Sequence, residues 1–193
     1  MFPLSHGNKK LGKDTMILNM TPAENCPSKS KNLCQMPNGV TCYARKAERC
    51  YPSCLPYRKK QEKLWNTLTV EQIFQDIKSQ VGKSRKHMIK YIRFSECGDF
   101  KSQKDVDKMS ELADKLKTID IILYGYTARS DLTYDNKSDN MIVNGSSFKV
   151  DNEFKAIPKE ARPKKNEFIC PGNCRYCRAC KGKNGLKILC WYH

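Results

Sequence analysis

Residues 87–94 read HMIKYIRF and residues 119–124 read IDIILY, and these two stretches decide the fold. Each is a largely apolar run, which is typical of a strand buried on both faces of a parallel sheet. The residues between them carry apolar side chains at helical spacing, namely Val106, Met109, Leu112, Ala113 and Leu116. A strand, a helix and a second strand in this order predict a βαβ unit, and therefore an α/β fold with a parallel sheet.

The flanking segments predict further elements around this unit. Thr69 and Gln72 have the spacing of a capping box, so we expect a helix to begin there. Residues 141–150 predict a hairpin around Asn144-Gly145, a pair that type I′ turns favour. Residues 26–54 contain five cysteines and several prolines, and they predict a cysteine-rich loop.

The overall composition fits a folded protein. The chain has 193 residues, of which 39% are hydrophobic, which is enough for a core. No apolar run approaches the length of a membrane span, and the N-terminus lacks the apolar stretch of a secretory signal. We therefore expect a cytoplasmic protein that does not bind membranes. It divides into an α/β domain over residues 1–157 and a cysteine-rich segment over residues 158–193.

The eleven cysteines favour metal ligation over disulfide bonds. Disulfides rarely persist in a reducing compartment, and an odd number of cysteines cannot pair completely within one chain. Thiolates are good ligands for zinc and for iron–sulfur clusters. We therefore expect at least one metal site.

The tightest cysteine pattern is CPGNCRYCRAC, which runs from Cys170 to Cys180. Its four thiols, Cys170, Cys174, Cys177 and Cys180, can converge on one centre if the backbone wraps around it. The intervening Pro, Gly and Asn favour the turns that such wrapping requires. The spacing contains CxxxCxxC and reverses the order found in bacterial ferredoxins, so it favours a 4Fe–4S cluster.

Zinc is the alternative for this segment. Cys177 and Cys180 with Cys190 and His193 would give two pairs of ligands, the usual arrangement of a tetrahedral zinc site. The formal charge of +16 is compatible with a nucleic-acid partner, although basic residues also compensate the charge of a cluster. A zinc-stabilised nucleic-acid-binding protein is therefore the second hypothesis.

The other cysteines are more widely spaced. Cys26, Cys34, Cys42, Cys50 and Cys54 precede the βαβ unit, and three or four of them could hold a second cluster or a zinc ion. A buried apolar role is equally compatible with their spacing.

A third group of residues follows the two strands of the βαβ unit. Because ligands bind at the carboxyl ends of parallel strands, these side chains are candidates for one small-molecule pocket. The candidates are Glu96, Asp99, Tyr126, Thr127 and Arg129, and Gly98 would let the backbone approach a ligand closely. The structural alternative is an ion pair between Asp99 and Arg129.

Several motifs resemble a family of phage-encoded proteins named after gene product eighty-eight of a mycobacteriophage. The matching stretches are Gly7–Gly12 (GNKKLG), Cys42–Ala47 (CYARKA), Ser95–Phe100 (SECGDF), Tyr126–Arg129 (YTAR) and Ile169–Cys174 (ICPGNC). That family is similar to radical S-adenosylmethionine (SAM) enzymes, so the resemblance implies a partial (β/α) barrel with iron–sulfur ligands. It also implies a phage protein that works in the host cytoplasm.

The resemblance implies roles for particular residues. Cys170, Cys174, Cys177 and Cys180 would ligate one cluster, and Cys26, Cys34 and Cys42 would form a further ligand set. Gly98-Asp99 would occupy the strand-end loop that holds the methionine part of SAM in radical SAM enzymes. In those enzymes, however, the tight CxxxCxxC follows the first strand, whereas here it lies at the C-terminus. Cluster binding therefore follows from the resemblance more directly than SAM binding does.

These observations predict an iron–sulfur protein with a redox or radical-SAM-like role. It would carry one 4Fe–4S cluster and, if the N-terminal cysteines also bind, two. Its partner would be a small-molecule substrate or a redox protein, neither of which the sequence identifies.

Overall fold

The computed structural model describes residues 1–7, 10–34, 42–83 and 88–191. It is an α/β fold with one open sheet of eight strands, in the order β1-β2-β3-β4-β5-β6-β8-β7. The strands are β1 (Ser5–His6), β2 (Thr15–Leu18), β3 (Tyr91–Phe94), β4 (Ile122–Thr127), β5 (Met141–Ser146), β6 (Asn152–Ile157), β7 (Phe168–Ile169) and β8 (Lys187–Trp191). Only the edge pair of β1 and β2 is antiparallel among the described strand pairs, so the sheet is mostly parallel.

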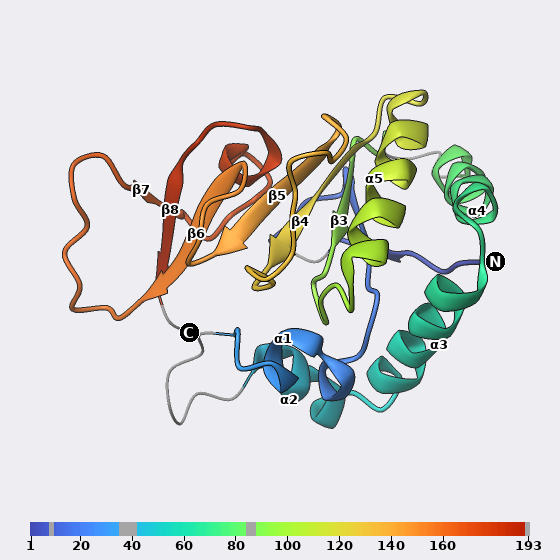
Figure 1. Ribbon diagram of the computed structural model, residues 1–193, viewed down its shortest axis with the longest axis horizontal. Coiled ribbons are helices and arrows are strands. Elements are labelled where there is room, and N and C mark those ends of the chain that lie inside the picture. Colours follow the sequence, from blue (N-terminus) through green and yellow to red (C-terminus); the bar gives the residue numbers. More distant parts are fainter. Residues whose placement is uncertain (8–9, 35–41, 84–87, 192–193) are drawn as a thin grey trace.

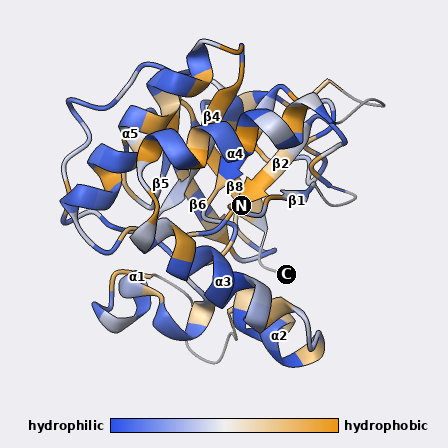
Figure 2. Ribbon diagram, turned by 90° about the vertical axis from the view of Figure 1, so that its right-hand side faces the viewer, coloured by the Kyte–Doolittle hydropathy of each residue, from blue (hydrophilic) through white to orange (hydrophobic). Residues whose placement is uncertain are grey.

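The helices lie in two groups (Figure 1). The longer ones are α3 (Cys54–Thr67), α4 (Val70–Gly82) and α5 (Gln103–Lys117), and α4 and α5 pack beside each other along the sheet. The short helices α1 (Pro27–Ser30) and α2 (Tyr43–Cys50) lie with the 3₁₀ turn η1 (Ala23–Asn25), below the ends of β3 and β4. Figure 2 shows this second group set apart from the main body of sheet and helices. A further 3₁₀ turn, η2 (Ala179–Lys181), belongs to the C-terminal segment.

The βαβ prediction is confirmed. β3 and β4 are parallel neighbours, with Tyr91 paired to Ile122 and Phe94 to Gly125, and α5 connects them. Alternate residues of these strands, such as Ile92 and Leu123, are fully buried in the main core. The core also contains the apolar residues predicted for α5, which explains why this segment forms a helix: one face is covered by the sheet.

The predicted capping box is also confirmed. Thr69 Oγ1 accepts a hydrogen bond from the Gln72 amide, and Gln72 Oε1 accepts one from the Thr69 amide. Ser102, the N-cap residue that precedes α5, makes no such side-chain hydrogen bond. There, Asp105 accepts a hydrogen bond from the Lys101 amide at 2.7 Å.

The predicted hairpin over residues 141–150 is wrong. β5 is parallel to both of its neighbours, and Asn144-Gly145 lies inside it rather than in a turn. The reason is tertiary, because the Asn144 side chain is fully buried and donates to the Gly125 carbonyl at 2.9 Å. Gly145 is required for packing, since a Cβ at this position would collide with the Phe148 carbonyl.

The interpretation of residues 26–54 as a loop is only partly correct, because α1 and α2 form within it. His87, where the first predicted strand begins, lies outside the described residues. The C-terminal segment adds β7 and β8 to the same sheet that β1–β6 form. Within the described ranges, no helix is long and apolar enough to cross a membrane.

Candidate metal centre

One face of the sheet is polar and aromatic. Residues of β3 and β4 that alternate with the core residues point away from α4 and α5. Tyr91 and Tyr124 meet edge to face there, with ring centroids 6.0 Å apart. The Arg93 guanidinium lies over the Tyr126 ring, 5.0 Å from its centroid.

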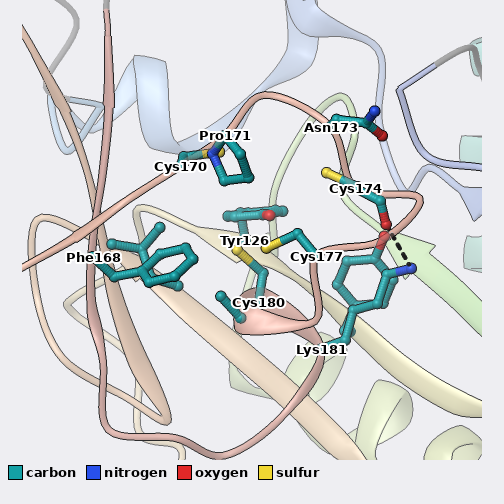
Figure 3. Close-up of a pocket in the computed structure, with 12 residues that line it drawn as sticks. Tyr126, Phe168, Cys170, Pro171, Asn173, Cys174, Cys177, Cys180 and Lys181 are labelled. Carbon is teal, nitrogen blue, oxygen red and sulfur yellow. Dashed lines mark hydrogen bonds between the residues drawn. The ribbon is translucent and has the colours of Figure 1, made fainter.

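The C-terminal cysteines cover this face. Cys170, Cys174, Cys177 and Cys180 line one small pocket together with Tyr124, Tyr126 and Lys181. Figure 3 shows the pocket, with Cys174, Cys177 and Cys180 projecting from the loop toward the space beside the Tyr126 ring. The structure thus brings together the four thiols that the sequence grouped.

The pocket is closed rather than open. Its free volume is about 20 Å³, roughly the space of one water molecule. Among the described residues, no three Cys, His, Asp or Glu side chains are placed so that they could already hold a metal ion. A metal or cluster would therefore require the thiol side chains to be arranged differently.

Two buried asparagines hold the base of this loop. Asn144 donates to the Cys180 carbonyl at 3.0 Å. Asn152 donates to Asn144 Oδ1 at 3.0 Å and to the Gly182 carbonyl at 2.8 Å. Nearer the start of the loop, the Cys170 and Cys174 amides bond to the Leu189 and Lys10 carbonyls. The backbone around the thiols is therefore fixed at both ends, while the segment between them is largely exposed.

Positive charge surrounds the pocket. Lys181 is 5% exposed, and its Nζ lies 4.1 Å from the centroid of the Tyr91 ring. No carboxylate in the described part of the chain forms an ion pair with Lys181 or Arg93; the Lys181 ammonium instead lies 3.5 Å from Thr15 Oγ1 and from the Cys174 carbonyl. Desolvation lowers the pKa of Lys181, which shows that burial opposes its charge.

Two polar atoms of this face also lack partners. The Arg93 Nε and the Tyr124 hydroxyl are buried and make no hydrogen bond within the described parts of the chain. Buried polar groups of this kind are costly, so a native fold normally satisfies them. An anionic group held by the four thiols would face Arg93, Tyr124 and Lys181. Thiol donors and nearby positive charge are the kinds of group that an iron–sulfur cluster requires, although the described side chains are not placed to hold one.

Burial favours the protonated form of two of these thiols. Burial raises the pKa of Cys180 to about 12 and also raises the pKa of Cys174. Cys190, which the sequence placed only in the alternative zinc site, interacts with Cys170, and this contact and burial raise the pKa of Cys190. His193, its possible partner in a zinc site, lies outside the described residues.

Cys26 and Cys42 lie near Cys97, in the loop that follows β3. Cys42 packs against the small apolar cluster of Ala23, Ala44 and Cys97. Burial raises the pKa of Cys26 to about 11, and the neighbouring Asp99 and Cys34 add to this shift. Cys97 is buried, and its Sγ lies 3.5 Å from Glu48 Oε1. Cys97 comes three residues after the end of β3, and this place in the sequence was a signal that it would meet the N-terminal group.

Asp99 joins this N-terminal group to the sheet. Its Oδ2 accepts hydrogen bonds from Ser28 Oγ at 2.6 Å and the Ala128 amide at 2.8 Å. Its Oδ1 accepts from Thr127 Oγ1 at 2.7 Å and the Phe100 amide at 2.9 Å. The carboxylate is thus fully engaged within the protein.

The other predicted pocket residues are divided between the two regions. Tyr126 lines the pocket of the C-terminal thiols. Arg129 pairs with Asp131, with Nε 2.6 Å from Oδ1, rather than with Asp99. Gly98 has φ +77°, and a Cβ there would collide with Thr21. The Glu96 carbonyl accepts a hydrogen bond from the Tyr43 hydroxyl, so the loop after β3 contacts α2.

Comparison with known families agrees with these motifs. The model of a family described as Gene product 88 matches residues 3–173. The chain belongs to the gene product 88 family. The match to the gene product 88 model includes Cys26, Cys34, Cys42 and Cys170, and it ends before Cys174. No curated protein and no solved structure matches the chain.

Proposed function

We propose that this protein binds an iron–sulfur cluster through Cys170, Cys174, Cys177 and Cys180 and uses it in redox chemistry. The observation that carries the proposal is the convergence of four thiols on one pocket beside Lys181 and Arg93, which form no ion pair with a carboxylate among the described residues. When bound, a 4Fe–4S cluster accepts or donates one electron. The chain supplies the ligands, excludes water and places positive charge against the cluster.

Cys26, Cys34 and Cys42 are proposed as a second ligand set. They belong to the N-terminal group that Asp99 and Ser28 fasten to the end of the sheet. Three cysteines would leave one iron of a 4Fe–4S cluster without a protein ligand. SAM is a candidate ligand for that iron, and a radical mechanism would then be possible. The support for SAM is weaker than that for the C-terminal cluster, because the hydrogen bonds of Asp99 are all used internally.

The second candidate function is a zinc-stabilised protein that binds nucleic acid. It is supported by the contact of Cys190 with Cys170, which brings a fifth thiol to the C-terminal group. The net charge of +16 also supports it. Binding would then weaken steeply with salt, because phosphate contacts release counterions.

Anaerobic purification followed by metal and sulfide analysis distinguishes these functions. The proposal predicts roughly four irons per chain for the C-terminal site alone, or roughly eight with the N-terminal site, and an absorption band near about 400 nm. An iron-free protein that contains zinc would overturn the proposal and support the nucleic-acid-binding function. A protein with neither metal would exclude both.

Lys181 should raise the reduction potential of the cluster. Its buried ammonium favours the more negative, reduced state, so Lys181→Met should lower the potential by about 60 mV, a tenfold change for a one-electron couple. An anaerobic redox titration followed by electron paramagnetic resonance measures this shift. Lys183→Met, which removes a more exposed lysine paired with Asp139, is the control and should leave the potential nearly unchanged. Equal shifts in the two variants would contradict this role.

A further inference from the structure

A groove lies on the outer side of the cysteine loop. It has a volume of about 590 Å³, and its lining includes Phe168, Pro171, Tyr176, Cys177, Arg178 and Leu186. Tyr176 is 85% exposed and Phe168 is 36% exposed, so two aromatic rings border open solvent. Exposed aromatic residues of this kind are enriched where proteins bind one another.

Cys177 connects this groove to the buried pocket. It lines both, whereas Cys170, Cys174 and Cys180 line only the inner pocket. Under the proposed function, Cys177 is therefore the ligand through which the cluster comes nearest to the groove. An electron carrier seated in the groove would be separated from the cluster by little more than this side chain.

The charge around the groove indicates the kind of partner. Residues 168–191 contain five basic residues and no Asp or Glu: Arg175, Arg178, Lys181, Lys183 and Lys187. In the folded protein Lys183 pairs with Asp139, Lys187 pairs with Glu167, and Lys181 is buried. Arg178 is the cation of this set that lines the groove. The Arg178 side chain is 48% exposed, and its closest acidic partner, Asp14, is at 3.5 Å. Positive residues around an apolar centre favour an acidic partner and accelerate its association.

We propose that this groove docks an acidic electron-transfer protein, which exchanges one electron with the cluster through Cys177. The inference rests on the proposed function, since it requires the cluster. Tyr176 and Phe168 would form the apolar contact, and Arg178 would orient the partner. The interface is small and polar at its edge, as is usual for short-lived redox encounters.

The electron balance is simple. The reduced carrier loses one electron, and the oxidised cluster gains it. No bond between the proteins is formed, and no proton has to cross the groove. The carrier then dissociates, which a weak, salt-sensitive interface permits.

The test uses the iron-loaded protein and a flavodoxin with an acidic surface as the probe. Reduction of the cluster by reduced flavodoxin is followed anaerobically by stopped-flow absorbance. The bimolecular rate constant should fall as the salt concentration rises, and it should fall about tenfold in the Tyr176→Ser/Arg178→Ser double variant. The control double variant Tyr51→Ser/Lys78→Ser removes an exposed tyrosine and lysine elsewhere and should react like the wild type.

Two further measurements separate the possible failures. Iron content and reduction by dithionite report on the cluster alone, and both should be the same in the double variant and the wild type. Equal flavodoxin rates in the two proteins, with both measurements normal, would overturn the docking site but leave the proposed function intact. Binding of an oligonucleotide is measured for the same proteins. If the double variant loses this binding but keeps the flavodoxin rate of the wild type, the groove binds nucleic acid. Absence of iron in the wild type would overturn both proposals.

Discussion

Replacing Cys180 by serine should abolish the C-terminal cluster. Its side chain lies within the pocket beside Tyr126, and the hydrogen bond from Asn144 to the Cys180 carbonyl fixes the backbone there. A serine hydroxyl stays protonated and is a poor ligand for iron, so three thiolates would remain for a site that needs four. We expect anaerobic metal analysis of Cys180→Ser to show the loss of about four irons per chain and of the absorption near about 400 nm.

Cys50→Ser is the matched control. Cys50 is exposed at the end of α2, outside the pocket of the four C-terminal thiols. The iron content of the Cys50→Ser protein should therefore match that of the wild type. Far-ultraviolet circular dichroism checks that both variants fold. A folded Cys180→Ser protein with unchanged iron would contradict the C-terminal site. If Cys26→Ser then lost its iron, the cluster would belong to the N-terminal group instead.

The sequence was most informative where local pattern and tertiary environment agree. The runs at 87–94 and 119–124 predicted parallel strands, because a strand covered on both faces needs few polar residues, and β3 and β4 are such strands. The Thr69–Gln72 box predicted the start of α4, because a capping box depends only on neighbouring residues.

The sequence misled where a distant segment decides the local structure. Asn144-Gly145 has the composition of a turn, but the Asn144 amide is needed to hold the Gly125 and Cys180 carbonyls. The turn propensity of Asn-Gly contains no information about these two distant hydrogen bonds. For the same reason, the hydrogen bonds of Asp99 to Ser28 and Thr127 could not be read from spacing alone.

The candidate site was predicted in part. The spacing of Cys170 to Cys180 predicted that the four thiols lie together, and all four line one pocket, since a short loop keeps its own residues near one another. Their role as ligands stays a prediction. The cations were harder to predict, because Arg93 and Lys181 come from segments far apart in the chain and meet only across the folded sheet. Tyr126 and Thr127 were expected in one pocket, but they lie on opposite faces of β4: Tyr126 lines the pocket of the C-terminal thiols, whereas Thr127 points toward Asp99.

The second large effect should come from Asp99→Ala. Asp99 is 4% exposed, and its carboxylate accepts hydrogen bonds from two hydroxyls and two backbone amides. Alanine would leave the Phe100 and Ala128 amides buried without acceptors, and each such donor costs about 1–3 kcal/mol. With the cavity that the substitution creates, we expect the free energy of unfolding to fall by about 4 kcal/mol, measured by urea denaturation.

Asp99→Asn and Asp107→Ala complete the experiment. Asparagine keeps the shape of the side chain but presents an NH₂ group to one of the two amides, so it should cost about half as much as alanine. Asp107 is exposed on α5 and bonds only to Gln103 among the described residues, so its replacement should cost less than about 0.5 kcal/mol. A loss below about 1 kcal/mol for Asp99→Ala would show that water replaces the carboxylate in these bonds. A large loss would instead identify Asp99 as the residue that keeps the Cys26 segment against the end of the sheet, because Ser28 is joined to β4 through this carboxylate.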